Sequence, residues 1–334
     1  MPPRPSHGAR RLLATALALG ACTGRFVRPV TAERFAPTPE RLARGDYLVN
    51  QVSACGFCHT TRDSGSLLDT EGTTRFLGGG NLVTDNGVRF TVPNITPDLT
   101  TGIGGWSDDE VARAITDGVR PDGRFLFPVM PYDEYQHLSD EDVRAVVVYL
   151  RSAPPVSQPE PRVTPKLGLV AGLMLETLAV QMHRPAAGVV APGRADRVAW
   201  GRYVAFAAAC TGCHSMTDRA PIGEGEDGYL GGSVVPVLPG LGAGLVYARN
   251  LTPDVETGLG RYTAAQLKAS LETGVRLDGR RLAPPMSIVL PHYGGMTGDD
   301  LDALVAYLRS VKPARHRVPE RRLTKAQADE VGEE

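Results

Sequence analysis

Cys55-Gly-Phe-Cys58-His59 and Cys210-Thr-Gly-Cys213-His214 are two copies of one pattern, C-x-x-C-H, and they set the organisation of this chain of 334 residues. Each copy stands near the head of one half of an internal duplication. Residues 94–130 and 250–286 align without a gap, and 16 of the 37 aligned positions are identical. Because similarity at a fixed offset marks a repeat, the sequence predicts two structural units of the same kind.

Residues 38–153 and 193–313 form the two predicted units, and each is expected to be mainly α-helical. In both units one helix leads into the C-x-x-C-H motif, a capping box opens a second helix, and a third helix carries an apolar stripe. Strand character is confined to short stretches near residues 83–92 and 234–246. The expected helices begin at Thr38, Ser107 and Ser139 in the first unit and at Arg197, Thr263 and Thr297 in the second.

The spacing within the motif favours covalent attachment of haem. Two cysteines one helical turn apart can form thioether bonds along one edge of the porphyrin, and the histidine that follows can ligate the iron. Thiol exchange and zinc binding are rival interpretations of a C-x-x-C pair, but thiol exchange needs no histidine and zinc needs four clustered ligands. Two complete motifs therefore predict two covalently attached haem c groups, with His59 and His214 bound to iron.

The repeat also selects Met130 and Met286 as candidates for the sixth iron ligand. Both end the aligned segments, in a stretch that we expect to be irregular. A single methionine would be interpreted as a core side chain, whereas matching positions favour ligation, which closes the iron and raises its potential. Three histidines have no counterpart in the other unit and are expected at the surface or in loops, although His292 stays an alternative ligand because it follows Met286 closely. These histidines are His137, His183 and His292.

A third repeated segment, Asn94-Ile-Thr-Pro-Asp98 with its copy at 250–254, is expected to form a turn. Contact with a haem propionate is the alternative role. Trp106 and Tyr262 occupy equivalent positions after this turn, and we expect them to pack near the haem.

The N-terminus has the pattern of an export signal. Basic residues precede the apolar run 12–21, which is too short to span a bilayer. Cys22, which neither motif uses, follows Leu19-Gly20-Ala21 and resembles the lipidated cysteine of bacterial lipoproteins, with an ordinary secretory signal as the alternative. The pattern predicts a signal peptide over 1–21, a lipid anchor at Cys22, a tether over 22–37 and a periplasmic, membrane-anchored protein.

Residues 154–192 are rich in proline and are expected to link the two units. Within this linker the stretch 167–180 is apolar, and we expect a helix laid across the units, with a contact to a membrane or a partner as the alternative. Residues 314–334 form a charged C-terminal tail.

Charge and hydropathy exclude two classes of protein. Lysine and arginine total 36 against 37 acidic residues, so the net charge of -1 provides no basic field for a nucleic acid. No apolar run reaches the length of a membrane-spanning helix, which excludes a multi-span membrane protein.

Together these motifs resemble the c-type cytochromes with two or three haems, such as the cytochrome c subunits of bacterial membrane-bound alcohol, aldehyde and gluconate dehydrogenases. The resemblance implies two tandem cytochrome c domains, thioether bonds at the four motif cysteines, and iron ligation by His59, Met130, His214 and Met286. Two features depart from the family: the chain has two haem motifs where three are usual, and Ser287 rather than proline follows the second methionine. The segments that carry the resemblance are the two C-x-x-C-H motifs, Asn94–Asp98, Gly118–Arg124, Met130–Tyr132 and Ser139–Val143.

The resemblance implies an exported electron carrier with no substrate chemistry of its own. It would pass single electrons from a redox protein, such as a membrane-bound dehydrogenase, to a downstream acceptor. A di-haem peroxidase is the alternative from a different class, and it requires one haem without a methionine ligand. The matched positions of Met130 and Met286 favour the carrier.

Overall fold

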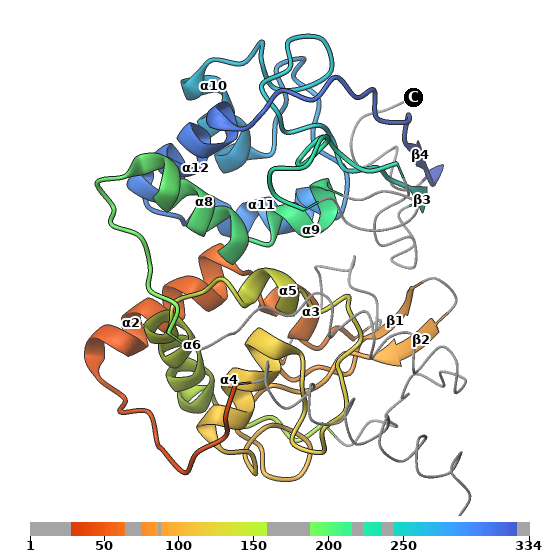
Figure 1. Ribbon diagram of the computed structural model, residues 1–334. Helices are drawn as coiled ribbons and strands as arrows, with labels where there is room; N and C mark the ends of the chain where they lie inside the picture. The colour runs from red at the N-terminus through yellow and green to blue at the C-terminus, as the bar shows by residue number, and fades with distance from the viewer. Residues whose placement is uncertain are drawn as a thin grey trace, which may run out of the picture.

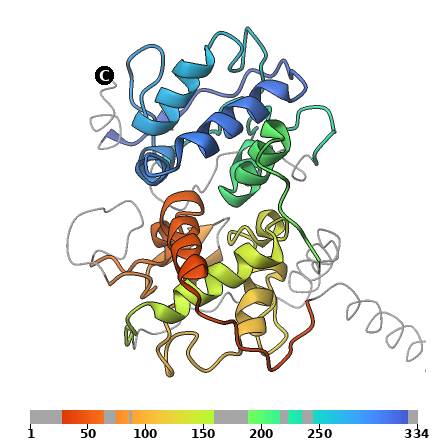
Figure 2. The ribbon, with the colours of Figure 1, turned by 90° about the vertical axis from the view of Figure 1, so that its left-hand side faces the viewer.

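The computed structural model describes residues 28–63, 75–85, 88–158, 188–215, 223–234 and 244–325. Figure 1 shows two helical halves, one above the other, and Figure 2 shows the same division after a quarter turn. The prediction of mainly α-helical units is confirmed. No helix among the described residues is long and apolar enough to cross a membrane. The predicted signal peptide, Cys22, His183 and the apolar stretch 167–180 lie outside the described residues.

The first unit contains the three predicted helices, a hairpin and two short helices. Its first helix is capped by Thr38, whose hydroxyl accepts a hydrogen bond from the Arg41 backbone N–H at 3.3 Å. A π-helical segment then leads the chain to the first motif. The elements are α2 (Pro39–Tyr47), η1 (Leu48–Val52), α3 (Gly56–His59), β1 (Leu82–Asp85), β2 (Val88–Thr91), α4 (Asp108–Asp117), α5 (Tyr132–Tyr135) and α6 (Asp140–Ser152).

The second unit repeats the order of helices with a longer helix after the second methionine. Its two strands pair across a long stretch of sequence instead of forming a hairpin, because β3 contacts a strand close to the end of the described chain. The elements are α8 (Arg197–Ala207), α9 (Cys210–His214), β3 (Gly244–Leu245), α10 (Ala264–Thr273), α11 (Met286–Tyr293), α12 (Gly298–Ser310) and β4 (Arg322–Leu323).

The second helix of each unit has the predicted capping box. In α4 the Ser107 hydroxyl accepts from the Glu110 backbone at 3.2 Å, and the Glu110 carboxylate accepts from the Ser107 backbone at 2.7 Å. Thr263 and Gln266 form the same reciprocal pair at the start of α10. Reciprocal pairs of this kind satisfy two backbone donors that the helix itself leaves open. The left-handed glycines that follow these helices are Gly118 and Gly274.

The first and third helices of each unit cross at a glycine. A side-chain Cβ at Gly45 in α2 would lie 2.1 Å from the carbonyl oxygen of Ala145 in α6, and one at Gly201 in α8 would lie 1.9 Å from that of Ala303 in α12. No other residue type permits such an approach of two helices. The repeated glycine in the pattern Gly-x-Tyr therefore sets the helix packing that carries both motifs.

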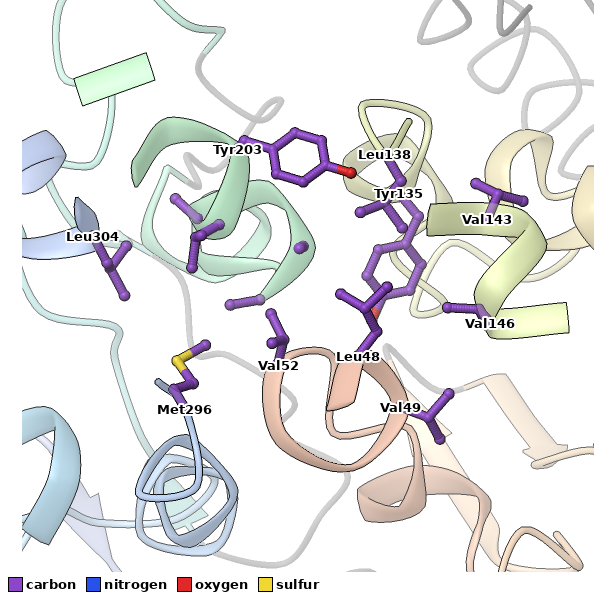
Figure 3. Close-up of a cluster of buried hydrophobic side chains, with 14 of the residues drawn as sticks. Leu48, Val49, Val52, Tyr135, Leu138, Val143, Val146, Tyr203, Met296 and Leu304 are labelled. Carbon is purple, nitrogen blue, oxygen red and sulfur yellow. The ribbon is translucent and has the colours of Figure 1, made fainter. Parts of the chain in front are cut away.

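One continuous apolar core joins the two units. Figure 3 shows Val52 from η1 close to Met296 of the second unit, and Tyr203 of the second unit directed toward Leu138 of the first. Met296 is 6% exposed and belongs to this core. The units therefore meet through buried side chains, and this contact fixes how the two motifs lie relative to each other.

Candidate functional site

The two C-x-x-C-H motifs lie on short helices near the boundary between the units. Figure 1 places α3 and α5 at the top of the lower half and α9 and α11 at the bottom of the upper half. Each motif follows an alanine in the left-handed conformation, with φ of 46° at Ala54 and 51° at Ala209. The sharp backbone turn at these alanines separates the preceding helix from the motif. The two sites therefore share an unusual backbone feature as well as their sequence.

Both motif histidines are buried and are held by a backbone carbonyl. The Nδ1 of His59 lies 2.8 Å from the carbonyl oxygen of Pro93, and the Nδ1 of His214 lies 2.6 Å from that of Arg249. A carbonyl can only accept, so each Nδ1 carries the proton and Nε2 is left with its lone pair. Burial lowers the pKa of both imidazoles. Each ring is therefore held in the neutral form and tautomer that binds iron through Nε2.

The motif cysteines have the properties of attachment residues and not of redox thiols. All four are free of disulfides and partly buried. Burial raises the pKa of Cys55, Cys58 and Cys210 to about 12 and that of Cys213 to about 11. Thiol exchange requires a lowered pKa, because the thiolate is the attacking species. Among the described residues, no cluster of three or more His, Cys, Asp or Glu side chains offers the zinc arrangement.

A repeated Leu-Gly-Gly segment supports the motif in each unit. The backbone N–H of Gly79 donates to the carbonyl of His59 at 2.6 Å, and that of Gly232 donates to the carbonyl of His214 at 2.8 Å. Both glycines have positive φ, and a Cβ at Gly79 would lie 2.5 Å from the backbone nitrogen of Asn94. This segment was not among the predicted site residues, although Leu77-Gly-Gly and Leu230-Gly-Gly are visible as a repeat in the sequence.

The Asn-x-Thr-Pro-Asp segment forms the predicted turn and also clamps another part of the chain. The Asn94 Oδ1 accepts from the Thr96 backbone at 2.9 Å, while its Nδ2 donates to the Val156 carbonyl at 2.6 Å. In the second unit Asn250 makes the same turn and donates to the Ala314 carbonyl at 2.7 Å. This clamp fixes the segment after the third helix of each unit. The residues predicted as a charged tail thus begin as a clamped segment and contribute β4.

The two candidate methionines occupy equivalent but differently structured positions. Met130 lies in a turn, where its backbone N–H donates to the Phe127 carbonyl at 3.1 Å, and its side chain is half-buried against the core. Met286 is also half-buried against the core, but it is the first residue of α11. The expectation of an irregular stretch is therefore wrong at Met286. The Pro-Met-Ser-Ile-Val-Leu sequence continues as helix, and Pro291 lies inside it.

Two unmatched histidines lie between the units and not at the free surface. The His137 ring stacks on Phe206 of the second unit with centroids 4.0 Å apart. The Nδ1 of His292 lies 2.8 Å from the Asn50 carbonyl oxygen of the first unit. His137 lies in the turn between α5 and α6, as expected for a loop histidine, whereas His292 lies in α11, so the expectation is wrong for His292. His292 joins the two units through this contact.

Two equivalent tyrosines cross the boundary in opposite directions. Tyr47 of the first unit donates to Asp300 of the second at 2.7 Å, and Tyr203 of the second donates to Asp142 of the first at 2.6 Å. Each hydroxyl also accepts from the backbone N–H of the residue that caps the other unit's third helix, at 3.1 and 2.9 Å. The boundary is therefore built like the contact of a two-fold dimer, in which the same surface serves both partners.

The second motif also contacts the first unit across this boundary. The Thr211 hydroxyl, inside the second motif, donates to the Glu134 carboxylate in α5 of the first unit. A charge on Cys213 raises the pKa of Cys58, so the cysteines of the two motifs lie within electrostatic reach of each other. The Ser53 hydroxyl, just before the first motif, donates to the Ala207 carbonyl at 2.8 Å. Two cofactor sites are thus held side by side.

The donor set fits haem. Each site combines a pair of thiols one helical turn apart with a buried imidazole whose Nε2 is available. The repeat adds one methionine side chain to each site, Met130 or Met286. The second site also has a buried hydroxyl, Ser287 Oγ beside Met286, with no hydrogen-bond partner. A buried polar atom without a partner is rare in a folded protein and indicates a group that completes the site.

Comparison with known protein families decides the class of this chain. Residues 40–150 match the family described as cytochrome c oxidase, cbb3-type, subunit III, and residues 198–312 match the cytochrome c family. The chain belongs to the c-type cytochromes and has two cytochrome c domains in tandem. Two such domains imply two covalently attached haem c groups, so the predicted fold class and cofactors are confirmed.

Relatives of this di-haem cytochrome are similar over most of the chain. The fructose dehydrogenase cytochrome subunit of Gluconobacter japonicus is 30% identical over 86% of this chain and 56% of its own length. The gluconate 2-dehydrogenase cytochrome c subunit of Pantoea cypripedii is 32% identical over 80% of this chain and 59% of its own length. The chain thus spans a little over half of these two relatives. A di-haem c-type cytochrome of Cereibacter sphaeroides is 26% identical over 90% of this chain and 98% of its own length.

The names of the two dehydrogenase relatives describe cytochrome subunits and not catalytic subunits. This agrees with the prediction that the chain carries electrons and is not itself an enzyme. It also agrees with the predicted resemblance to dehydrogenase cytochromes.

Proposed function

We propose that this di-haem cytochrome is the electron-transfer subunit of a periplasmic dehydrogenase complex, taking single electrons from the dehydrogenase and passing them to a downstream acceptor. The observation that carries the proposal is the contact of the second motif with the first unit across a shared core. Thr211 of the second motif hydrogen-bonds to Glu134 of the first unit, and Cys58 and Cys213 are within electrostatic reach. An electron that enters at one haem can then leave from the other without a step of diffusion.

The proposed attachment and ligand residues follow the repeat. Cys55 with Cys58, and Cys210 with Cys213, form the thioether bonds, and His59 and His214 bind iron through Nε2. Met130 and Met286 supply the sixth ligands, which exclude oxygen and peroxide and raise the potential. When bound, the haem iron supplies one-electron chemistry between its ferrous and ferric states. The chain's own contribution is to hold the imidazoles with backbone carbonyls and to keep the two sites in one rigid contact.

The proposed organisation places the cytochrome c domains at 38–153 and 193–313, with the linker between them and the charged tail 314–334 after them. The signal peptide 1–21 directs export, and the lipidated Cys22 then holds the mature protein on the periplasmic side of a membrane. Their support is the sequence alone: a basic start, an apolar run of export length and a cysteine after Leu-Gly-Ala. A diacylated cysteine would keep the haems near membrane-bound partners.

The lipid anchor is tested by Cys22→Ala followed by membrane fractionation and mass measurement of the N-terminus. The proposal expects the wild type in the membrane fraction with an acylated residue 22, and the variant released. A soluble wild type whose mature chain begins at another residue would contradict the lipid anchor and support only the export signal.

The proposed partner is tested by purification of the holoprotein from membranes in mild detergent. The relatives named for fructose and gluconate 2-dehydrogenases make sugars and sugar acids the first substrates to try. We expect a dehydrogenase subunit to co-elute and to reduce both haems when its substrate is added. Elution of the cytochrome alone, with active dehydrogenase in other fractions, would contradict the role of a permanent subunit and indicate a free electron carrier.

A further inference from the structure

We propose that Glu134 couples electron transfer to proton uptake at the second haem, although it belongs to the first unit. Glu134 would take up one proton from solvent when one electron reaches the second haem site from its donor, and would release the proton when the electron leaves. The net charge of the site is then the same in both oxidation states. The inference depends on haem attachment at Cys210 and Cys213 and on no particular partner.

The first argument is position. Glu134 lies in α5, four residues after Met130, and its carboxylate crosses the boundary between the units to α9, the helix of the second motif. The Thr211 hydroxyl donates to Oε1, and a Cβ at Gly212 would lie 3.7 Å from the same oxygen. Thr211 and Gly212 are the two residues between the cysteines that hold the second haem. A carboxylate at this place lies beside the porphyrin edge to which those cysteines attach.

The second argument is the isolation of the carboxyl group. Glu134 is 5% exposed, and its Oε2 is buried without a hydrogen-bond partner. None of the basic side chains that the structure describes forms an ion pair with it. A buried carboxylate without a counter-charge is costly, so the charge of the nearby iron has an unusually large effect on its protonation.

The third argument comes from the groups that face Glu134. Asp133 lies on its own helix, Cys210 and Cys213 lie on α9, and Tyr229 faces it from the second unit. Haem attachment converts both thiols into uncharged thioethers, and Tyr229 is neutral at ordinary pH because its pKa is raised by burial. Burial, with a smaller contribution from Asp133, raises the pKa of Glu134 to about 8, and the Thr211 hydroxyl opposes the shift. The carboxyl group therefore titrates near the pH at which a periplasmic protein works.

The internal repeat shows that Glu134 has no carboxylate counterpart at the equivalent position of the second unit. Counted back from the equivalent helix caps Ser139 and Thr297, the position equivalent to Glu134 in the second unit is His292. Its ring also crosses the boundary but ends on the Asn50 carbonyl, outside the first motif. At this position the second unit therefore presents an imidazole and not a carboxylate to the first unit. The coupling is expected at one haem and not at both.

The test is a spectroelectrochemical titration of the intact holoprotein over a range of pH. In the wild type we expect the midpoint potential of the second haem to fall as pH rises through the ionisation of Glu134, by up to one proton per electron. In Glu134→Gln, which keeps the size and an accepting oxygen, we expect that component to become independent of pH. The variant Met286→His assigns the two redox transitions: the transition whose midpoint potential falls in this variant belongs to the second haem. Unchanged pH dependence in Glu134→Gln would overturn the proposal.

Two further variants keep the test decisive if Glu134→Gln folds poorly. Thr211→Val removes the hydroxyl that stabilises the ionised carboxylate, so the pH dependence should move to higher pH; an unmoved transition overturns the proposal. Glu141→Gln is the matched control, because it makes the same chemical change at an exposed residue of α6 paired with Arg41, and the wild-type profile should be retained. A redox-difference infrared spectrum should show the carbonyl band of a protonated carboxyl on reduction, absent in Glu134→Gln. Neither readout needs the dehydrogenase, so failure of the partner assignment leaves this test intact.

Discussion

At the scale of single residues, backbone hydrogen bonds fix the tautomer and orientation of the two motif histidines. His59 and His214 each donate Nδ1–H to a backbone carbonyl that comes just before the Asn-x-Thr-Pro-Asp turn. A backbone acceptor cannot be removed by mutation of a side chain, and it has no charge that would draw a second proton onto the ring. The turn, held by Asn94 and Asn250, therefore acts on the iron site through the position of one carbonyl.

The methionine ligands are tested separately at the two sites. We expect Met130→Ala and Met286→Ala each to lose the weak absorbance at the red edge of the spectrum that a methionine–iron bond gives, and each to lower the potential of one haem only. The oxidised visible spectrum and a redox titration measure these effects. Rapid peroxide turnover by the wild type, or the same spectrum in wild type and variant, would favour a peroxidase with an open iron.

Burial of Glu134 also predicts how stability depends on pH. The pKa of this group is about 8 in the folded protein and 4.5 for a free side chain, so between these values the folded state binds more protons than the unfolded chain. Stability from this group is therefore full at low pH and falls as pH rises from about 4.5 through about 8. As pH rises over this range, the free energy of unfolding of Glu134→Gln should fall less than that of the wild type. We expect the two falls to differ by a few kcal/mol, on the order of what such a pKa shift is worth. Chemical denaturation of the ferrous protein at both ends of the range measures it, and parallel losses would contradict the burial argument.

At the scale of elements, the crossing of the first and third helices depends on one glycine in each unit. Gly201→Ala places a methyl group 1.9 Å from the Ala303 carbonyl oxygen, so α8 and α12 must move apart. We expect a loss of about 3 kcal/mol or more in the free energy of unfolding. Thermal unfolding of the holoprotein measures the loss.

Gly193→Ala is the control for this prediction, because nothing lies within 4 Å of the position that its Cβ would take. It should change stability by less than about 0.5 kcal/mol. Equal effects of the two alanines would show that the helix crossing tolerates the side chain.

Most elements of this protein could be predicted, because their signals are local. The capping boxes of Ser107 and Thr263 and the glycines that end α4 and α10 are written in four or five neighbouring residues. The helix that begins at Met286 could not be predicted from its counterpart, since Ser287 replaces a proline and lets the chain continue helically. The β3–β4 pair joins residues far apart in the sequence, and a two-residue strand carries no periodicity.

At the scale of the whole molecule, the duplication produced two copies of one domain and also a specific contact that joins them. Tyr47 and Tyr203 were visible as repeated residues, but their exchange across the boundary depends on how the units pack, which no local pattern encodes. The same holds for Glu134, whose role beside the second motif follows from a contact between residues 77 positions apart. The candidate haem sites were predictable from C-x-x-C-H, whereas the way the sites are joined was not.

The exchanged tyrosines predict a symmetric effect on the boundary. Tyr47→Phe and Tyr203→Phe each remove a hydroxyl that donates to a buried carboxylate and accepts from a helix-capping residue. We expect each variant to lose about 1–3 kcal/mol in the free energy of unfolding, because a buried carboxylate, Asp300 or Asp142, loses a hydrogen-bond donor. Denaturant titration of both variants measures this. A loss in only one of them would contradict the two-fold character of the boundary.

The central claim, that both C-x-x-C-H motifs hold haem covalently, is tested most directly by counting haem per chain. The pyridine haemochrome spectrum and the mass of the intact protein should give two haems, and extraction with acidified acetone should leave both on the chain. The pair Cys55→Ala and Cys58→Ala should leave one haem, as should Cys210→Ala with Cys213→Ala. A wild-type chain that carries one haem or none, or one that releases its haem to the solvent, would contradict the account.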